Sequence, residues 1–223
     1  MSCALCEQRK EKRFCPAVHG RICAQCCGEQ REVTLDCPSE CPYLQQARQH
    51  EKPHELGDAD RAAMFPEIEI NETFMYEHEH LLLGLSFALA KSARTARSLD
   101  NHALTDRDLI AALTSLAKSY QTLVESSLIY EQPTANLAHH QIAHEVATMV
   151  KEFREAEQKH MGYSRLRDSE VLKALVFLLR MGLARTSGRP KSRAFVDFLF
   201  AQFPESHSAI AVPEDGVSRI VIP

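Results

Sequence analysis

The sequence predicts a mainly α protein, a helical bundle with a small cysteine-rich module at its N-terminus and a short β-hairpin at its C-terminus. Three observations carry this prediction. All eight cysteines lie within the first 41 residues. From Glu72 onward, apolar residues recur at the spacing of helix faces. Near the C-terminus, two short apolar stretches flank Pro-Glu-Asp-Gly, a pattern typical of a β-hairpin.

The bulk composition is that of an ordinary globular chain. Of 223 residues, 25% are charged and 44% hydrophobic, and the formal net charge of -4 provides no global attraction to nucleic acid or anionic lipid. No apolar run reaches the roughly 18 residues that a membrane span needs. Charged residues follow Cys3 and Cys6 at once, so the N-terminus lacks the apolar centre of a signal peptide. We therefore expect a cytoplasmic protein without a membrane partner, in a reducing compartment where clustered cysteines indicate metal.

The cysteines form pairs whose spacing suits zinc. Cys3/Cys6 and Cys23/Cys26 are Cys-x2-Cys pairs, which bring two thiolates to one ion from a tight turn. Two looser pairs lie between and after them. We predict two structural zinc ions, with the four pairs interleaved, although a sequential assignment has the same ligands. These ligands are Cys3, Cys6, Cys15, His19, Cys23, Cys26, Cys37 and Cys41.

The eighth cysteine, Cys27, is left over and could replace Cys26 by a shift of one residue. Four protein ligands around each zinc leave no position for a reacting water, so both ions are expected to be structural. The segment holds few apolar residues, and metal binding should therefore be coupled to its folding.

The order of ligands, with one histidine in fourth place, resembles a RING finger, and the compact spacing with Cys15-Pro16 also resembles the HIT and MYND fingers. The resemblance covers about residues 3 to 44 and implies an interleaved two-zinc module. A RING finger would imply binding to a ubiquitin-conjugating enzyme, and Leu5 and Pro38 match apolar and proline positions of that family. The three-residue gap between Cys37 and Cys41 departs from the usual RING gap of two, and the chain has no tryptophan. HIT and MYND fingers place their histidine later.

We divide the chain into a two-zinc finger module (1–50), a linker (51–66), a helical domain (67–203) and a C-terminal hairpin or tail (204–223). A short helix is expected directly after Cys41. Lys52-Pro53 and Gly57 indicate the linker, and alternating Glu and Ile at 67–70 predict a short strand.

Five helices are expected in the helical domain. The first runs over 72–99, and the second begins after a Thr105 cap and runs to about residue 130. The third is capped by Thr134 and ends near 161–162. The fourth starts at 168 or 169, is apolar nearly all round and should be central. The fifth covers 191–203, and the hairpin joins 209–212 to 217–222.

A basic run begins at Arg180 and leads into the fifth helix, whose first turn is expected to hold Lys191 and Arg193. Free amides of a helix start and guanidinium groups together favour an anion, such as a phosphate or an acidic partner group. We predict an anion site there, made by Arg185, Arg189, Lys191 and Arg193.

These features favour a non-enzymatic adaptor protein that binds a protein partner through its finger. No catalytic residue is predicted, because the chain has no phosphate loop, nucleophile elbow or dinucleotide motif. The alternative is a regulatory nucleic-acid-binding protein that uses the basic run and the Arg and Lys residues of 9–13, and a ubiquitin ligase ranks below it. A homo-oligomer formed through the helices is also compatible with the sequence.

Overall fold

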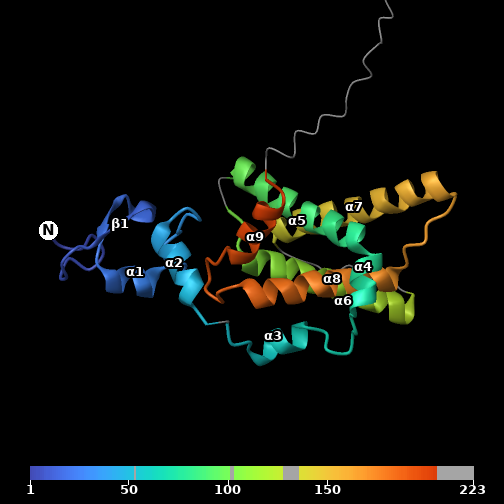
Figure 1. The fold of residues 1–223 in the computed structure, drawn as a ribbon, viewed down its shortest axis with the longest axis horizontal. Helices are drawn as coiled ribbons and strands as arrows, with labels where there is room; N and C mark the ends of the chain where they lie inside the picture. Colours follow the sequence, from blue (N-terminus) through green and yellow to red (C-terminus); the bar gives the residue numbers. More distant parts are fainter. Residues whose placement is uncertain (53, 101–102, 128–135, 205–223) are drawn as a thin grey trace, which may run out of the picture.

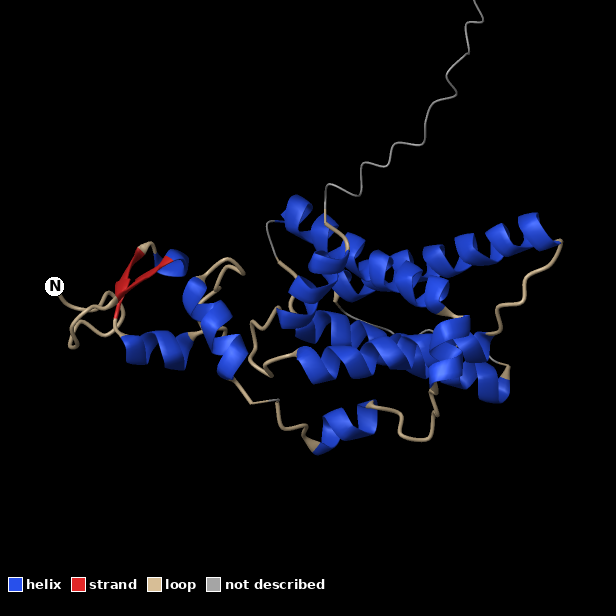
Figure 2. Cartoon of the chain, in the orientation of Figure 1, coloured by secondary structure: helices blue, strands red, loops and turns tan. Residues whose placement is uncertain are grey.

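The computed structural model describes residues 1–52, 54–100, 103–127 and 136–204. In these ranges the chain forms nine α-helices and one two-stranded sheet, which confirms the mainly α fold (Figure 2). The predicted hairpin at 209–212 and 217–222 lies outside the described residues.

The finger is built from short elements around buried thiols. Strands β1 (Arg13–Cys15) and β2 (Gly20–Ile22) pair antiparallel, with the 3-10 turn η1 (Pro16–Val18) between them. Helix α1 (Ala24–Gln30) follows, and helix α2 (Pro42–His50) is the short helix predicted after Cys41. Apart from cysteines, the fully buried apolar side chains here are few, chiefly Ile22 and Leu44. The finger therefore has a small apolar core of its own.

The helical domain has a separate, larger core. Helix α8 lies at its centre, because nearly every apolar residue of this helix is buried, as predicted from its uniform apolar pattern. It packs most extensively on α6, while α5 packs on α7 and α9 covers α5 and α8. The helices are α4 (Glu72–Glu77), α5 (Glu79–Asp100), α6 (Asp106–Ser126), α7 (Leu137–Met161), α8 (Asp168–Arg185) and α9 (Ala194–Gln202).

Helix starts largely follow the caps that the sequence offers. Thr105 caps α6 as predicted, and the Asp108 carboxylate accepts hydrogen bonds from the Thr105 amide (2.9 Å) and hydroxyl (2.7 Å). Helix α7 is capped by Asn136, whose side-chain oxygen accepts from the Ala138 amide. The predicted cap Thr134 lies outside the described residues. The predicted first helix is interrupted at His78, whose ring stacks on Phe74.

The strand predicted at 67–70 is wrong, because this segment is a turn and loop. Arg180 of α8 explains the loop. Its guanidinium donates to the carbonyl oxygens of Met64 (2.9 Å), Phe65 (2.6 Å) and Ile68 (2.8 Å). Arg180 thus binds one carbonyl of the predicted strand, that of Ile68, and two carbonyls just before it, which holds the segment against α8. The predicted linker at 51–66 also contains a helix, α3 (Asp58–Ala63).

A buried carboxylate joins α6 to the start of α9. Asp106 is 0% exposed, and it accepts hydrogen bonds from the Ser192 hydroxyl (2.7 Å) and the amides of Phe195 (3.0 Å) and Val196 (3.1 Å). These amides have no partner within their own helix. Burial raises the pKa of Asp106 above its usual value, although the hydrogen bonds act in the opposite direction.

The finger docks on one end of the helical bundle, and α3 runs along the bundle's side (Figure 1). The polar contacts between the two parts come from the loop between α8 and α9 and from α9 itself.

Candidate metal centre

Four cysteine thiols converge in the finger. The sulfur atoms of Cys3, Cys6, Cys23 and Cys26 all lie within 4.8 Å of one another, and no other group of three or more metal-ligating side chains does so among the described residues. Cys23 caps α1, so Cys26 sits in the helix's first turn. Cys3/Cys6 and Cys23/Cys26 are the first and third ligand pairs along the chain, with Cys15/His19 between them. Their convergence is the interleaved arrangement rather than the sequential one, and it includes Cys26 rather than Cys27.

Hydrogen bonds favour the thiolate form on one side of this cluster. The backbone amide of Arg9, then that of Gln8 and the Arg9 guanidinium, lower the pKa of Cys6 to about 6. Burial acts to raise the pKa of Cys3, but amides led by that of Cys23, 3.1 Å from the Cys3 sulfur, lower it overall.

The other side of the cluster resists a further negative charge. Burial, and then the neighbouring thiols, raise the pKa of Cys26 to about 12. Four thiolates at this separation repel one another, so a divalent cation is needed for all four to ionise together. The cluster can therefore bind a metal ion, and its all-thiolate donor set fits zinc.

Two arginines that the sequence pattern had assigned to no metal site point at thiols. Arg9 lies 3.5 Å from the Cys26 sulfur, and Arg13 lies 3.7 Å from that of Cys27. A zinc ion with four thiolates is an anionic complex, and such arginines offset its charge from outside the ligand shell. Arginines interspersed between cysteine pairs are the sequence signal that would have identified them.

The other predicted ligands are arranged less tightly. Cys15, Cys37 and Cys41 are buried, and the Cys37 thiol lies close enough to Cys15 and Cys41 for their charges to act on it. Burial is the main reason why the pKa of Cys37 is raised. His19 is exposed, on a left-handed turn at φ 48°. This second set stays a prediction.

The basic run contacts the finger rather than open solvent. Arg189 donates to the carbonyl oxygen of Arg31 (2.8 Å), and Lys191 donates to that of Thr34 (2.8 Å). Arg193 donates to the Cys37 carbonyl (2.6 Å). Further ion pairs join Arg189 to Glu51 and Arg193 to Asp36, and Arg185 stacks over the ring of Phe198. The four cations predicted to bind an anion thus have protein partners, three of them in the N-terminal finger module.

Glu32 is the centre of this docking interface. It is 1% exposed, its carboxylate pairs with Arg48 (2.9 Å) and accepts from the Ser187 hydroxyl (3.0 Å), and its carbonyl accepts from the Lys191 amide (2.8 Å). Arg48 also pairs with Asp197 of α9 at 2.6 Å. Glu32 adopts a left-handed backbone at φ 54°, which is unfavourable for a residue with a side chain. The Glu32–Arg48 pair lies within the finger, whereas the bonds from Ser187 and Lys191 and the partly exposed Arg48–Asp197 pair cross to the helical domain.

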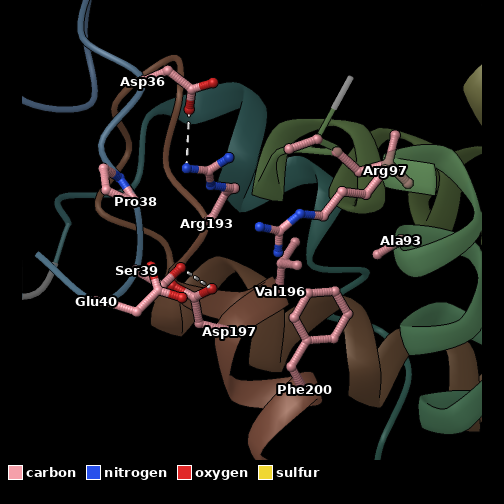
Figure 3. Close-up of a pocket in the computed structure, with 12 residues that line it drawn as sticks. Asp36, Pro38, Ser39, Glu40, Ala93, Arg97, Arg193, Val196, Asp197 and Phe200 are labelled. Atoms are coloured by element: carbon pink, nitrogen blue, oxygen red, sulfur yellow. Dashed lines mark hydrogen bonds and ion pairs between the residues drawn. The ribbon is translucent and has the colours of Figure 1, made fainter. Parts of the chain in front are cut away.

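A cavity of about 230 Å³ lies within this interface (Figure 3). Asp36 and Ser39 line it from the finger, each joined to a helical-domain residue, Arg193 and Asp197 respectively. Arg97 of α5 reaches it from the opposite side. Five of the twelve residues that line it are charged, and it belongs to the docking interface.

The chain matches no protein-family model, and comparisons with curated proteins and with solved structures return no match. No helix in the described ranges has the length and apolar character needed to cross a membrane.

Proposed function

We propose that this protein is a non-enzymatic adaptor whose N-terminal finger is folded around two structural zinc ions and binds a protein partner. The observation that supports the metal is the cluster of four thiols within 4.8 Å. With four sulfur ligands, a zinc ion there has no open coordination position, so its role is to hold the finger's loops.

The finger also exposes apolar side chains that its small core does not use. Leu5 is 39% exposed and Phe14 is 53% exposed. They lie on neighbouring segments, because the Ala4 amide donates to the Arg21 carbonyl while Phe14 pairs with Arg21 across the sheet. Exposed apolar side chains on a rigid, docked module favour a protein partner.

The contacts of the basic run rank nucleic acid below protein as the partner. Arg189, Lys191 and Arg193 already donate to finger carbonyls, so binding a phosphate there would compete with docking. A ubiquitin-ligase role remains what the RING resemblance implies, with Leu5 as the residue that it assigns to the partner surface.

Native mass spectrometry of the full chain with and without a chelator tests the metal. We expect two zinc ions, lost together with finger folding when the chelator is added. A protein that is metal-free as purified, binds no added zinc and keeps an ordered finger would refute the proposal.

Partner binding is tested by cross-linking in cell extract of the source organism. The wild type is compared with a Leu5→Asp/Phe14→Asp variant and with Leu83→Asp, which changes an exposed leucine of the helical domain (45% exposed). The proposal expects one product that only the finger variant loses. A product lost only with Leu83→Asp would instead place the partner on the helices.

A further inference from the structure

We propose that the finger's second metal ion is held by Cys15, Cys27, Cys37 and Cys41, with Cys27 in the place that the sequence pattern gives to His19. This inference rests on the proposed zinc-binding function and specifies one of its sites. It uses every cysteine of the chain, because the other four form the first cluster.

Burial separates the thiols from the imidazole. The four cysteines are 7 to 8% exposed and share one buried cluster with Ile22 and Leu44. His19, by contrast, is exposed. Structural zinc ligands are enclosed by their module, so an exposed ring on a turn is the poorer candidate.

Helix geometry turns Cys27 away from the first set, and an indirect contact through Arg13 connects it to the second. Cys26 and Cys27 are successive residues of α1, and successive side chains of a helix diverge by about 100°. Since Cys26 joins the first cluster, Cys27 points elsewhere. Its sulfur accepts from Arg13, whose guanidinium stacks 4.6 Å from the ring of Tyr43, two residues after Cys41. Arg13 thus bridges Cys27 to the segment that carries Cys41.

The sulfur atoms of the second set lie less close together than those of the first. Only the first cluster has all its sulfurs within 4.8 Å among the described residues. A tetrahedral zinc with bonds of about 2.3 Å holds its sulfurs about 3.8 Å apart. The second ion must therefore contract its ligands, and its binding should change the local structure more than binding of the first ion does.

Contraction at the second site acts directly on the docking interface. The Cys37 carbonyl accepts from Arg193, and the Cys37 thiol accepts from the Glu32 amide. An ion bound to the Cys37 sulfur would fix the loop that carries both contacts. The second metal is thus expected to strengthen docking of the finger on the helical domain.

The test counts zinc ions in the full chain by native mass spectrometry after metal reconstitution. Two ions are expected for the wild type and for His19→Ala, and one for Cys27→Ser. Cys27→His should restore the second ion, and cobalt substitution should then show a spectrum of three sulfurs and one nitrogen in place of four sulfurs.

The opposite pattern overturns the inference: one ion in His19→Ala with two in Cys27→Ser. A wild type that binds only one ion also overturns it while leaving the metal-binding finger intact, whereas a wild type that binds none refutes the proposed function itself. If Cys27→Ser unfolds the finger, the Cys27→His variant provides the test, because histidine can also bind zinc. Fewer than two zinc ions in Cys27→His would contradict the proposed ligand role of Cys27. Circular dichroism of each variant checks that the helical domain, which has its own core, stays folded.

Discussion

Replacing Glu32 with alanine tests whether this buried carboxylate stabilises the finger and its contact with the helical domain. The substitution removes a carboxylate that is 1% exposed and leaves two partners behind, Arg48 and Ser187. Arg48 keeps its contact with Asp197, which limits the loss.

The expected cost follows from these contacts. A hydrogen bond to a charged group contributes about 1.5–3 kcal/mol, and breaking a fully buried ion pair costs about 3–5 kcal/mol. The Arg48 side chain is 22% exposed, so water compensates part of the lost pair. Because the Arg48 pair lies within the finger and the Ser187 bond crosses the interface, we expect Glu32→Ala to lower the free energy of unfolding of the full chain by about 2–4 kcal/mol, a large share of a typical stability of about 5–15 kcal/mol.

Denaturant unfolding with zinc in excess measures this change, and hydrogen exchange locates it. The Lys191 amide donates to the Glu32 carbonyl, so it should exchange faster in the variant. Glu29→Ala is the matched control, because Glu29 is an exposed glutamate of the same finger bonded only to Gln25 in the described contacts, and a surface pair on a helix contributes about 0.2–0.5 kcal/mol. A Glu32→Ala effect no larger than that of Glu29→Ala would show that the Glu32 carboxylate stabilises neither the finger nor its contact with the helical domain.

Three further substitutions test other parts of the structure. Arg180→Ala should lower the free energy of unfolding by about 2–3 kcal/mol, because three carbonyls lose their donor, and Arg180→Lys should recover less than half of this loss. Equal stability of the wild type and both variants would contradict this. Gly188→Ala should lower the free energy of unfolding by about 1–2 kcal/mol or more, because φ is +71° and a methyl group would overlap the His54 ring. Adding His54→Ala should recover the part of this loss that is due to overlap, and denaturant unfolding curves measure both variants. Asp106→Ala should cost about 2–4 kcal/mol by leaving helix amides unpaired, whereas Asp106→Asn should cost less. Because folding raises the pKa of Asp106, the protonated carboxyl stabilises the fold below the unfolded pKa of about 3.9, and this stabilisation is lost as pH rises through the folded pKa. The stability of Asp106→Asn relative to the wild type should therefore be higher at pH 7 than at pH 4. The reverse trend would refute the raised pKa.

The sequence predicts most of what local rules govern. The helices of the bundle follow apolar periodicity and caps such as Thr105, and the central place of α8 follows from its uniform apolar pattern. The first thiol cluster follows from Cys-x2-Cys spacing. Contacts between distant segments were missed for a common reason. Arg180 reads in sequence as one member of a basic run, and nothing local shows that its partners are carbonyls more than 110 residues earlier.

The basic run shows the same limit with a functional consequence. Charge and a nearby helix start favoured an anion, but the finger offers carbonyl oxygens and carboxylates to the same side chains. A sequence pattern cannot separate an anion from a docked loop that presents acceptors, since both offer oxygen atoms to a guanidinium.

The docking interface also explains why metal binding in so small a finger would matter for the whole molecule. The finger's core is largely thiols, so its loops keep their shape only if the thiols are held. One of those thiols belongs to Cys37, whose carbonyl receives Arg193 and whose sulfur receives the Glu32 amide. Loss of metal would therefore loosen the residues that dock the finger as well as the finger itself. Under the proposed adaptor function, metal occupancy would set the orientation in which the exposed Leu5 and Phe14 are presented to a partner.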